Sequence, residues 1–306
     1  MDPSGLLLVD KGEGVTSFQV VALLRRLLGV HKIGHGGTLD PHATGLLPIL
    51  VGETTKLTPF LTEQDKEYEA TVLLGIRTDT LDVTGRVLET RPIPSLARET
   101  IEGLLARFVG EISQVPPMFS ALHHEGRRLH ELARQGVTVE RPPRKVRVHA
   151  IGLLDFALPR LTLRIACGKG TYVRSLCADL GEALRCGATV ERLTRTRVGR
   201  FPLADAAPWS EVASLRDPAP LWKRLLPPEA VLEHLASVSL PEHAATRFCH
   251  GQAVSHDGVS ADQIYRVLGP ETFLGVGVGT RQATIRPVRV FHAALDKSRR
   301  DPAERT

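Results

Sequence analysis

The chain is densest in turn-forming residues at positions 34–45, which read GHGGTLDPHATG. Asp40 lies between these glycines and a segment, Thr44–Thr62, that we expect to be mostly helical although two prolines interrupt it. Because Pro41 suits a first helical position, Asp40 can serve as the N-cap of that helix. Alternatively, Asp40 is a carboxylate on a rigid turn whose glycines let a substrate approach the backbone. Spacing alone favours the N-cap and leaves the second interpretation open.

The flanking segments alternate between strand and helix patterns. Upstream, we expect a strand at Leu6–Val9, a helix from the capping box at Thr16–Gln19 to Gly29, and a glycine-rich loop at 31–38. In the helix, Phe18 and Val21 begin the apolar spacing. Downstream, we expect strands at 67–74, 86–89, 145–154, 161–167 and 189–198, and helices at 97–108 and 171–185. The pattern predicts a mixed α/β fold.

Composition indicates an ordinary globular protein of 306 residues, with 42% hydrophobic and 24% charged residues. Its apolar runs are far shorter than the roughly 20 residues that span a bilayer. Residues 1–10 lack the basic and apolar regions of a secretory signal, so we expect a cytoplasmic protein. The four cysteines form no C-x-x-C pair, which favours buried free thiols over a disulfide framework or a zinc site.

The positive charge is concentrated in two segments. The net charge of the chain is +5, whereas residues 116–149 carry seven Arg or Lys against three Glu. Residues 169–200 again carry seven basic against three acidic residues, so the remainder of the chain is net negative. Concentrated positive charge favours a polyanionic partner, most simply a nucleic acid. Charge alone does not separate this interpretation from two solvated surfaces.

Proline pairs mark two boundaries. Residues 116–144 are bounded by Pro116-Pro117 and Pro142-Pro143, contain a helical stretch at 128–134, and are predicted to leave the core as a basic insertion. A change to short, glycine-rich apolar runs follows Pro227-Pro228. We therefore expect a first domain at 1–228 and a second at 229–294. The charged tail at 295–306 is predicted to be disordered.

Motifs for nucleotides, metals and flavins are not found. The chain has no G-x-x-x-x-G-K-[ST], no H-E-x-x-H and no G-x-S-x-G, and Asp79 and Asp82 lack calcium-loop spacing. Tyr172 and Arg174 fall in the first turn of a helix that follows Gly168-Lys169-Gly170, where free N–H groups favour an anion. They can equally be a core aromatic residue and a surface charge.

Five segments in order carry a more specific signal. They are 36–47 (GGTLDPHATGLL), 65–80 (DKEY followed by LGIRTDT), 114–121 (QVPPMFSA), 169–181 (KGTYVR followed by DLG) and 192–196 (RLTRT). Together they resemble the motifs of the TruB family of tRNA pseudouridine synthases, over about residues 5–200. Residues 235–292 are similar to a PUA domain, an RNA-binding β-barrel.

The resemblance implies a pseudouridine synthase core with a central, mostly antiparallel sheet and a small C-terminal PUA-like barrel. It implies isomerisation of uridine 55 in the T loop of tRNA to pseudouridine, with no metal, nucleotide or organic cofactor. The implied partner is the T stem-loop of tRNA. A membrane and a protein partner are not implied, and a monomer is expected.

The resemblance also implies roles for particular residues. Asp40 matches the catalytic aspartate, Arg174 the arginine that pairs with it, and Tyr68 the tyrosine that stacks on the target base. Tyr172 and Leu193 match residues that line the uridine pocket. His35 and Lys56 match residues that lie near the RNA. The insertion at 116–144 matches the loop that closes on the stem-loop.

The implied chemistry suits these residue types, but its order stays open. The base must leave the stack to be detached, turned and rejoined, and aromatic side chains can stabilise it by stacking. Arg174 would hold Asp40 ionised, and Tyr68 can take or relay the C5 proton. Asp40 can attack C1′ or C6, or assist departure of the uracil anion. Two alternatives remain: a non-catalytic RNA-binding or remodelling protein, and a guide-RNA-dependent relative, against which the insertion at 116–144 speaks.

Overall fold

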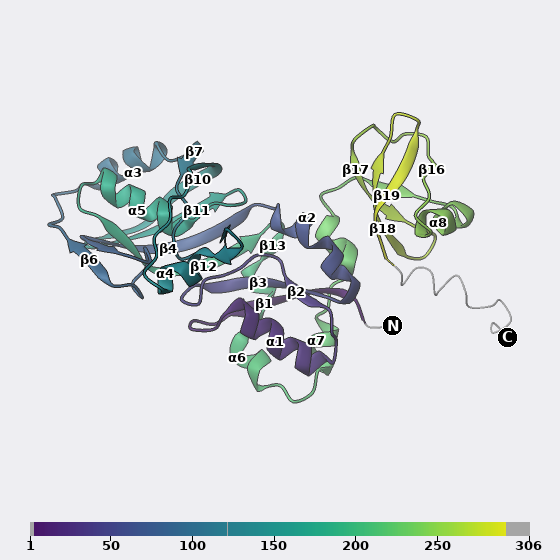
Figure 1. Cartoon of the computed structure of the whole chain (residues 1–306), viewed down its shortest axis with the longest axis horizontal. Coiled ribbons are helices and arrows are strands. Elements are labelled where there is room, and N and C mark those ends of the chain that lie inside the picture. Colours follow the sequence, from purple (N-terminus) through teal and green to yellow (C-terminus); the bar gives the residue numbers. More distant parts are fainter. Residues whose placement is uncertain (1–2, 121, 292–306) are drawn as a thin grey trace.

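The computed structural model describes residues 3–120 and 122–291, and within them ten strands form one large sheet (Figure 1). These strands are β1 (Gly5–Lys11), β2 (Ile33–His35), β3 (Thr44–Val51), β4 (Lys66–Leu74), β7 (Gly110–Gln114), β10 (Arg144–Ala157), β11 (Arg160–Cys167), β12 (Ala188–Val198), β13 (Phe201–Pro202) and β14 (Ala207–Pro208). The order is β14-β1-β3-β12-β4-β11-β10-β7, with β2 on β3 and β13 on β12. Only the β1–β14 and β3–β12 pairings are parallel, so the mixed α/β class and the mostly antiparallel sheet are confirmed.

The central strand β4 has the predicted alternation. Ala70 and Val72 are fully buried, and Glu69 on the opposite face is exposed. Helices α3 and α5 pack against this part of the sheet (Figure 1). Their apolar side chains and those of the sheet face that they cover form one hydrophobic core. The helices are α1 (Ser17–Leu28), α2 (Thr58–Thr62), α3 (Arg98–Ala106), α4 (Leu129–Arg134), α5 (Val173–Ala183), α6 (Trp209–Ser214), α7 (Ala219–Lys223) and α8 (Glu242–Cys249).

The capping box of α1 is confirmed. The Gln19 amide donates to Thr16 Oγ1 at 3.1 Å, the Thr16 amide donates to Gln19 Oε1 at 2.8 Å, and Gly29 ends the helix at φ 66°. The expectation that Phe18 belongs to the apolar face is wrong, because its side chain is 71% exposed. Ser17 takes the buried position instead, since its hydroxyl holds the backbone of Leu39.

The expected helix at Thr44–Thr62 is wrong over its first half. Residues 44–51 form β3, a 3-10 turn follows at Gly52–Leu57, and only Thr58–Thr62 are α-helical. Strand β3 is buried on both faces, with Leu47 in one apolar core and Leu46 in another. A strand covered on both sides has a continuous apolar run, which periodicity does not distinguish from a buried helix. The N-cap interpretation of Asp40 is wrong for the same reason, since no helix begins at Pro41.

The glycine-rich segment also differs in part from the expected loop. Residues Ile33–His35 form β2 and pair with the end of β3. Strand β6 (Val87–Thr90) confirms the strand expected at 86–89, and it pairs with β5 (Ile76–Thr78) in a hairpin.

The chain leaves the large sheet after β7 and returns to it at β10, and the segment between them holds the insertion expected at 116–144. It holds a short hairpin of β8 (His123–His124) and β9 (Arg127–Arg128), followed by α4. Its small apolar cluster is centred on Met118, Leu129 and Leu132, apart from the main core. Arg127, Arg128 and Arg134 are exposed, so the insertion presents positive charge outward.

The C-terminal residues form a second sheet, and the described part holds five strands in the order β15-β17-β18-β19-β16. They are β15 (Ser237–Ser239), β16 (Val254–Ser255), β17 (Ile264–Leu268), β18 (Phe273–Gly279) and β19 (Thr284–Val290). The sheet curls into a half-barrel beside α8, consistent with the PUA-like expectation (Figure 1). The predicted disordered tail at 295–306 lies outside the described residues.

The two sheets share an apolar cluster. Leu6 and Leu50 of the large sheet pack in it with Phe273, Val276 and Phe291 of the small one. The segment Pro228–Leu232 lies in the same cluster and contributes Val231 and Leu232. The four cysteines are buried and free, as predicted. None of the helices described is long and apolar enough to cross a membrane.

Candidate active site

A cavity of about 240 Å³ opens where the loop before β3 meets β4, β12 and the start of α5. Five of the seven predicted site residues line it: Asp40, Tyr68, Tyr172, Arg174 and Leu193. Thr38, Leu39, Ala43, Ser120, Thr171 and Val173 complete the lining. The structure thus brings together side chains that lie more than 150 positions apart in the sequence.

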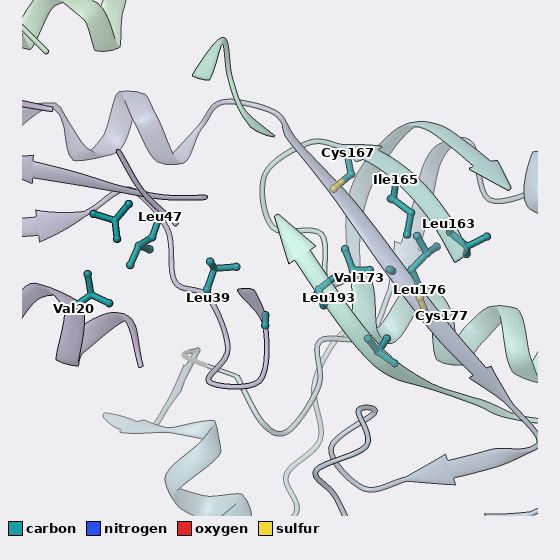
Figure 2. Close-up of a cluster of buried hydrophobic side chains, with 14 of the residues drawn as sticks. Val20, Leu39, Leu47, Leu163, Ile165, Cys167, Val173, Leu176, Cys177 and Leu193 are labelled. Carbon is teal, nitrogen blue, oxygen red and sulfur yellow. The ribbon is translucent and has the colours of Figure 1, made fainter. Parts of the chain in front are cut away.

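Asp40 lies on a loop that is anchored next to it. The Leu39 amide donates to Ser17 Oγ at 3.0 Å, and the same hydroxyl donates to the Leu39 carbonyl at 3.1 Å. The Leu39 side chain enters the core, with Val173 and Leu193 in the same cluster (Figure 2). The Asp40 side chain remains 36% exposed and lines the cavity. The loop therefore fixes the backbone of Asp40 and leaves its carboxylate accessible.

The Arg174 guanidinium is held on every side. Nε lies 2.9 Å from Asp40 Oδ2, and Nη1 lies 3.4 Å from Asp82 Oδ2. Nη1 also donates to the Thr80 carbonyl at 2.6 Å, and Nη2 donates to the Phe119 carbonyl at 2.7 Å. A planar guanidinium group with this many partners can adopt only one orientation, because turning it would break several of the contacts at once. Arg174 therefore presents Nε to Asp40 in a fixed direction.

Asp82 is a site residue that the sequence analysis missed. It is 5% exposed, and its Oδ1 accepts hydrogen bonds from Thr80 Oγ1 at 2.8 Å and from the Thr84 amide at 3.0 Å. This leaves Oδ2 for Arg174. The sequence signal is the T-x-D-x-T spacing at 80–84, which is typical of an Asx turn that orients its own carboxylate.

We expect Asp82→Ala to lower the free energy of unfolding by about 3 kcal/mol, because removing one partner of a buried ion pair leaves charge uncompensated. The control is Asp79→Ala, which removes an acceptor for the Arg86 amide and should cost about 1 kcal/mol. Urea unfolding of both variants measures the difference. Equal losses would show that Asp82 acts as a turn residue only.

Lys11 lies beneath the Asp40 loop and is fully buried. Its Nζ donates to the carbonyls of Gly12 at 2.9 Å, Val15 at 2.7 Å and Pro41 at 3.2 Å. Burial lowers the pKa of Lys11 from 10.5 to about 8, Asp40 acts against this shift, and Arg195 adds to it. The ammonium group is thus a further cation close to the candidate carboxylate.

The lowered pKa of Lys11 predicts a stability that rises with pH. Between pH 8 and 10.5 the unfolded chain still binds a proton that the folded chain has released, so raising the pH favours folding. Relative to Lys11→Met, the wild type should gain about 3 kcal/mol across this window. Urea unfolding at several pH values measures it, with exposed Lys223→Met as the control. A difference that does not change with pH would contradict the lowered pKa.

Both tyrosines of the cavity are protonated at neutral pH. Burial raises the pKa of Tyr68, and the nearby Arg195 opposes this in part. Burial likewise raises the pKa of Tyr172. The Tyr172 backbone is held by the Gln114 amide group, which accepts from its N–H at 2.8 Å and donates to its carbonyl at 3.0 Å. The cavity therefore offers two neutral aromatic rings on fixed backbones.

His35 and Lys56 do not line the cavity. His35 lies on β2, where burial and then the charge of Arg195 lower its pKa. Lys56 donates to the Val290 carbonyl at 2.7 Å, pairs with Glu53 and lies 5.9 Å from the centre of the Phe291 ring. Lys56 thus joins the two sheets. Within residues 3–120 and 122–291, no group of three His, Cys, Asp or Glu side chains is arranged to hold a metal ion.

Comparison with known families identifies the class. Residues 25–173 match the model "TruB family pseudouridylate synthase (N terminal domain)". Residues 174–233 match "tRNA pseudouridylate synthase B C-terminal domain", and residues 236–291 match "Pseudouridine synthase II TruB, C-terminal". The chain belongs to the TruB family of pseudouridylate synthases.

Individual relatives agree with this assignment. The chain is 45% identical to the tRNA pseudouridine synthase B of Dechloromonas aromatica over 290 residues, covering 95% of this chain and 96% of that one. It is 43% identical to the tRNA pseudouridine synthase B of Chromohalobacter salexigens, with 95% of each chain covered. Among solved structures, it is similar to a chain of a Cbf5-Nop10-Gar1 complex at a TM-score of 0.69 and 26% identity, covering 94% of this chain and 83% of that one.

Proposed function

We propose that the protein isomerises uridine 55 in the T loop of tRNA to pseudouridine. The observation that carries the proposal is the Asp40 carboxylate, which lines a cavity between two tyrosines with Arg174 Nε 2.9 Å away. The family and the printed names of its relatives support a pseudouridine synthase that acts on tRNA. The position within the tRNA rests on the sequence resemblance.

The reaction first requires the uridine to leave the stack. We assign the flipped base to the cavity of about 240 Å³. The cost of flipping is lower in a loop than in a duplex. The rings of Tyr68 and Tyr172 supply faces on which the base can stack, an interaction worth about 1–3 kcal/mol per base. Leu193 gives the cavity an apolar wall. These residues bind and orient the base for the chemical steps.

The chemistry then breaks the bond between N1 and C1′ and forms one between C5 and C1′. Asp40 serves as nucleophile at C1′ or C6, or stabilises the sugar as the uracil anion departs. Arg174 holds the carboxylate in one orientation through its Nε, which lies 2.9 Å from Asp40 Oδ2. C5 must then lose a proton, and N1, freed from the sugar, must gain one. Burial raises the pKa of Tyr68, so its hydroxyl is protonated: it can take the C5 proton only while passing its own proton on, to water or toward N1.

Residues outside the cavity are proposed to bind the backbone of the RNA. We assign the exposed arginines of the insertion at 116–144, together with the basic segment 169–200, to the phosphates of the T stem-loop. Binding should therefore weaken as salt rises. His35 and Lys56 are proposed to lie near the bound RNA outside the cavity. The domain boundary near 228 and an RNA-binding role for the PUA-like part belong to this proposal.

The proposal also concerns the assembly and the place of action. We propose that the chain acts as a monomer without a protein partner, since the insertion provides its own grip on the stem-loop. We also propose a cytoplasmic location, which a tRNA substrate supports.

The test uses an unmodified tRNA transcript labelled with tritium at uracil C5. The purified chain alone should release tritium, and mapping of the product should place pseudouridine at position 55. Binding without release would favour the non-catalytic alternative. Release only after addition of a guide RNA and partner proteins would favour the guide-dependent alternative. Release with pseudouridine elsewhere would correct the position.

A further inference from the structure

Arg195 is the largest of the fully buried side chains in the described structure, at 1% exposure. Arginine is rarely buried to this extent without a carboxylate partner. Among the residues described, no ion pair involves Arg195. Its guanidinium is satisfied by main-chain carbonyls instead. A buried, unpaired charge is costly, so its place in the fold calls for an explanation.

The partners of Arg195 lie on both sides of Asp40 in the chain. Nη2 donates to the Gly37 carbonyl at 3.0 Å, and Nη1 donates to the Thr38 carbonyl at 3.4 Å. Nε donates to the Leu46 carbonyl at 2.7 Å. One rigid guanidinium therefore joins the two ends of the loop that carries Asp40.

The backbone of Arg195 approaches the same loop. A Cβ built on Gly45 would lie 2.4 Å from the Arg195 carbonyl oxygen and 2.7 Å from its nitrogen. Gly45 also has φ at +99°, which a side chain would strain. The loop thus needs glycine at this position in order to lie directly against β12.

The other side of Arg195 faces the second candidate element. Arg195 on β12 is the register partner of Tyr68 on β4, and its charge lies close enough to oppose the rise of the Tyr68 pKa. Arg195 therefore joins the loop of Asp40, which its side chain binds, to the strand position opposite Tyr68. Moving Arg195 would move these two parts of the site relative to each other.

We propose that Arg195 is a positioning residue for the isomerisation: it fixes Asp40 relative to Tyr68. This inference rests on the proposed function. Arg195 does not line the cavity, so it acts through the loop rather than on the base. Lys11, which donates to the Pro41 carbonyl, supports the same loop from below.

The test compares Arg195→Lys and Arg195→Gln with wild type. We expect single-turnover tritium release to fall about 100-fold in both variants, with the dissociation constant for tRNA within about threefold of wild type. Because Arg195→Lys keeps the charge but loses the planar guanidinium, an equal loss in both variants assigns the effect to orientation rather than to charge. A structural role alone would lower the rate and the bound tRNA together, in proportion to the fraction of folded protein.

The control is Arg91→Gln. Arg91 pairs with Glu89 and Glu182 away from the cavity, so this variant reports the effect of lost stability alone. Release by the folded Arg195 variants at the rate of Arg91→Gln would overturn the inference. If Arg195→Gln does not fold, Arg195→Lys decides the question. Absence of release by wild type would instead count against the proposed function.

Discussion

Asp40→Asn should reduce tritium release from labelled tRNA by at least about 10⁴-fold while the fold and tRNA affinity stay nearly unchanged. The amide has the shape of the carboxylate but is neither a nucleophile nor an anion. The structure predicts little loss of stability, because the Asp40 side chain caps no helix and contacts Arg174 from a partly exposed position. Single-turnover release, thermal unfolding and filter binding measure the three quantities.

The control for Asp40→Asn is Asp155→Asn, which changes an exposed carboxylate on β10 and should leave release unchanged. Two results would contradict the assignment. Release at the wild-type rate would remove Asp40 from the centre of the chemistry. Failure of Asp40→Asn to fold would show that the carboxylate serves the loop rather than the reaction.

Arg174→Lys should reduce single-turnover release by about 10²–10³-fold. The positive charge is kept, but a single ammonium does not reach Asp40, Asp82 and the carbonyls of Thr80 and Phe119 together. Lysine also lacks the planar fork that fixes the direction of Nε toward Asp40. The expected loss is therefore in orientation, and it should appear in the rate rather than in the affinity for tRNA.

Arg164→Lys is the matched control, because Arg164 is exposed on β11 outside the basic segments, and it should keep wild-type activity. Arg174→Gln should lose more activity than Arg174→Lys, since it also removes the charge. Equal activity of Arg174→Lys and wild type would mean that charge alone suffices and that the fork has no role in orienting Asp40.

Local patterns predicted the parts of the fold that depend on neighbouring residues. The capping box of α1 and the alternation of β4 were predicted because their signals lie within a few positions. Strand β3 was missed because it is buried on both faces. The N-cap interpretation of Asp40 failed with it, and only the wider resemblance of five motifs directed attention to a catalytic role.

The supporting residues of the site escaped prediction for a different reason. Lys11 and Arg195 are bound by backbone carbonyl oxygens, among them those of Pro41, Gly37 and Thr38 in the Asp40 loop, and any residue type provides such a carbonyl. Such partners leave no pattern of side chains in the sequence. The position of Lys56 between the two sheets has the same origin, since its partner there is the Val290 carbonyl. Only the folded chain shows which carbonyls turn inward.

The apolar cluster shared by the two sheets has a consequence for how the protein can be divided. Leu46 and Leu50 of β3 are covered by the cluster that includes Phe273 and Phe291, and β3 begins directly after the Asp40 loop. The C-terminal sheet is therefore not an appendage that can be exchanged freely for another module. Any replacement would have to reproduce its apolar underside, or the strand that follows the Asp40 loop would be left open to water.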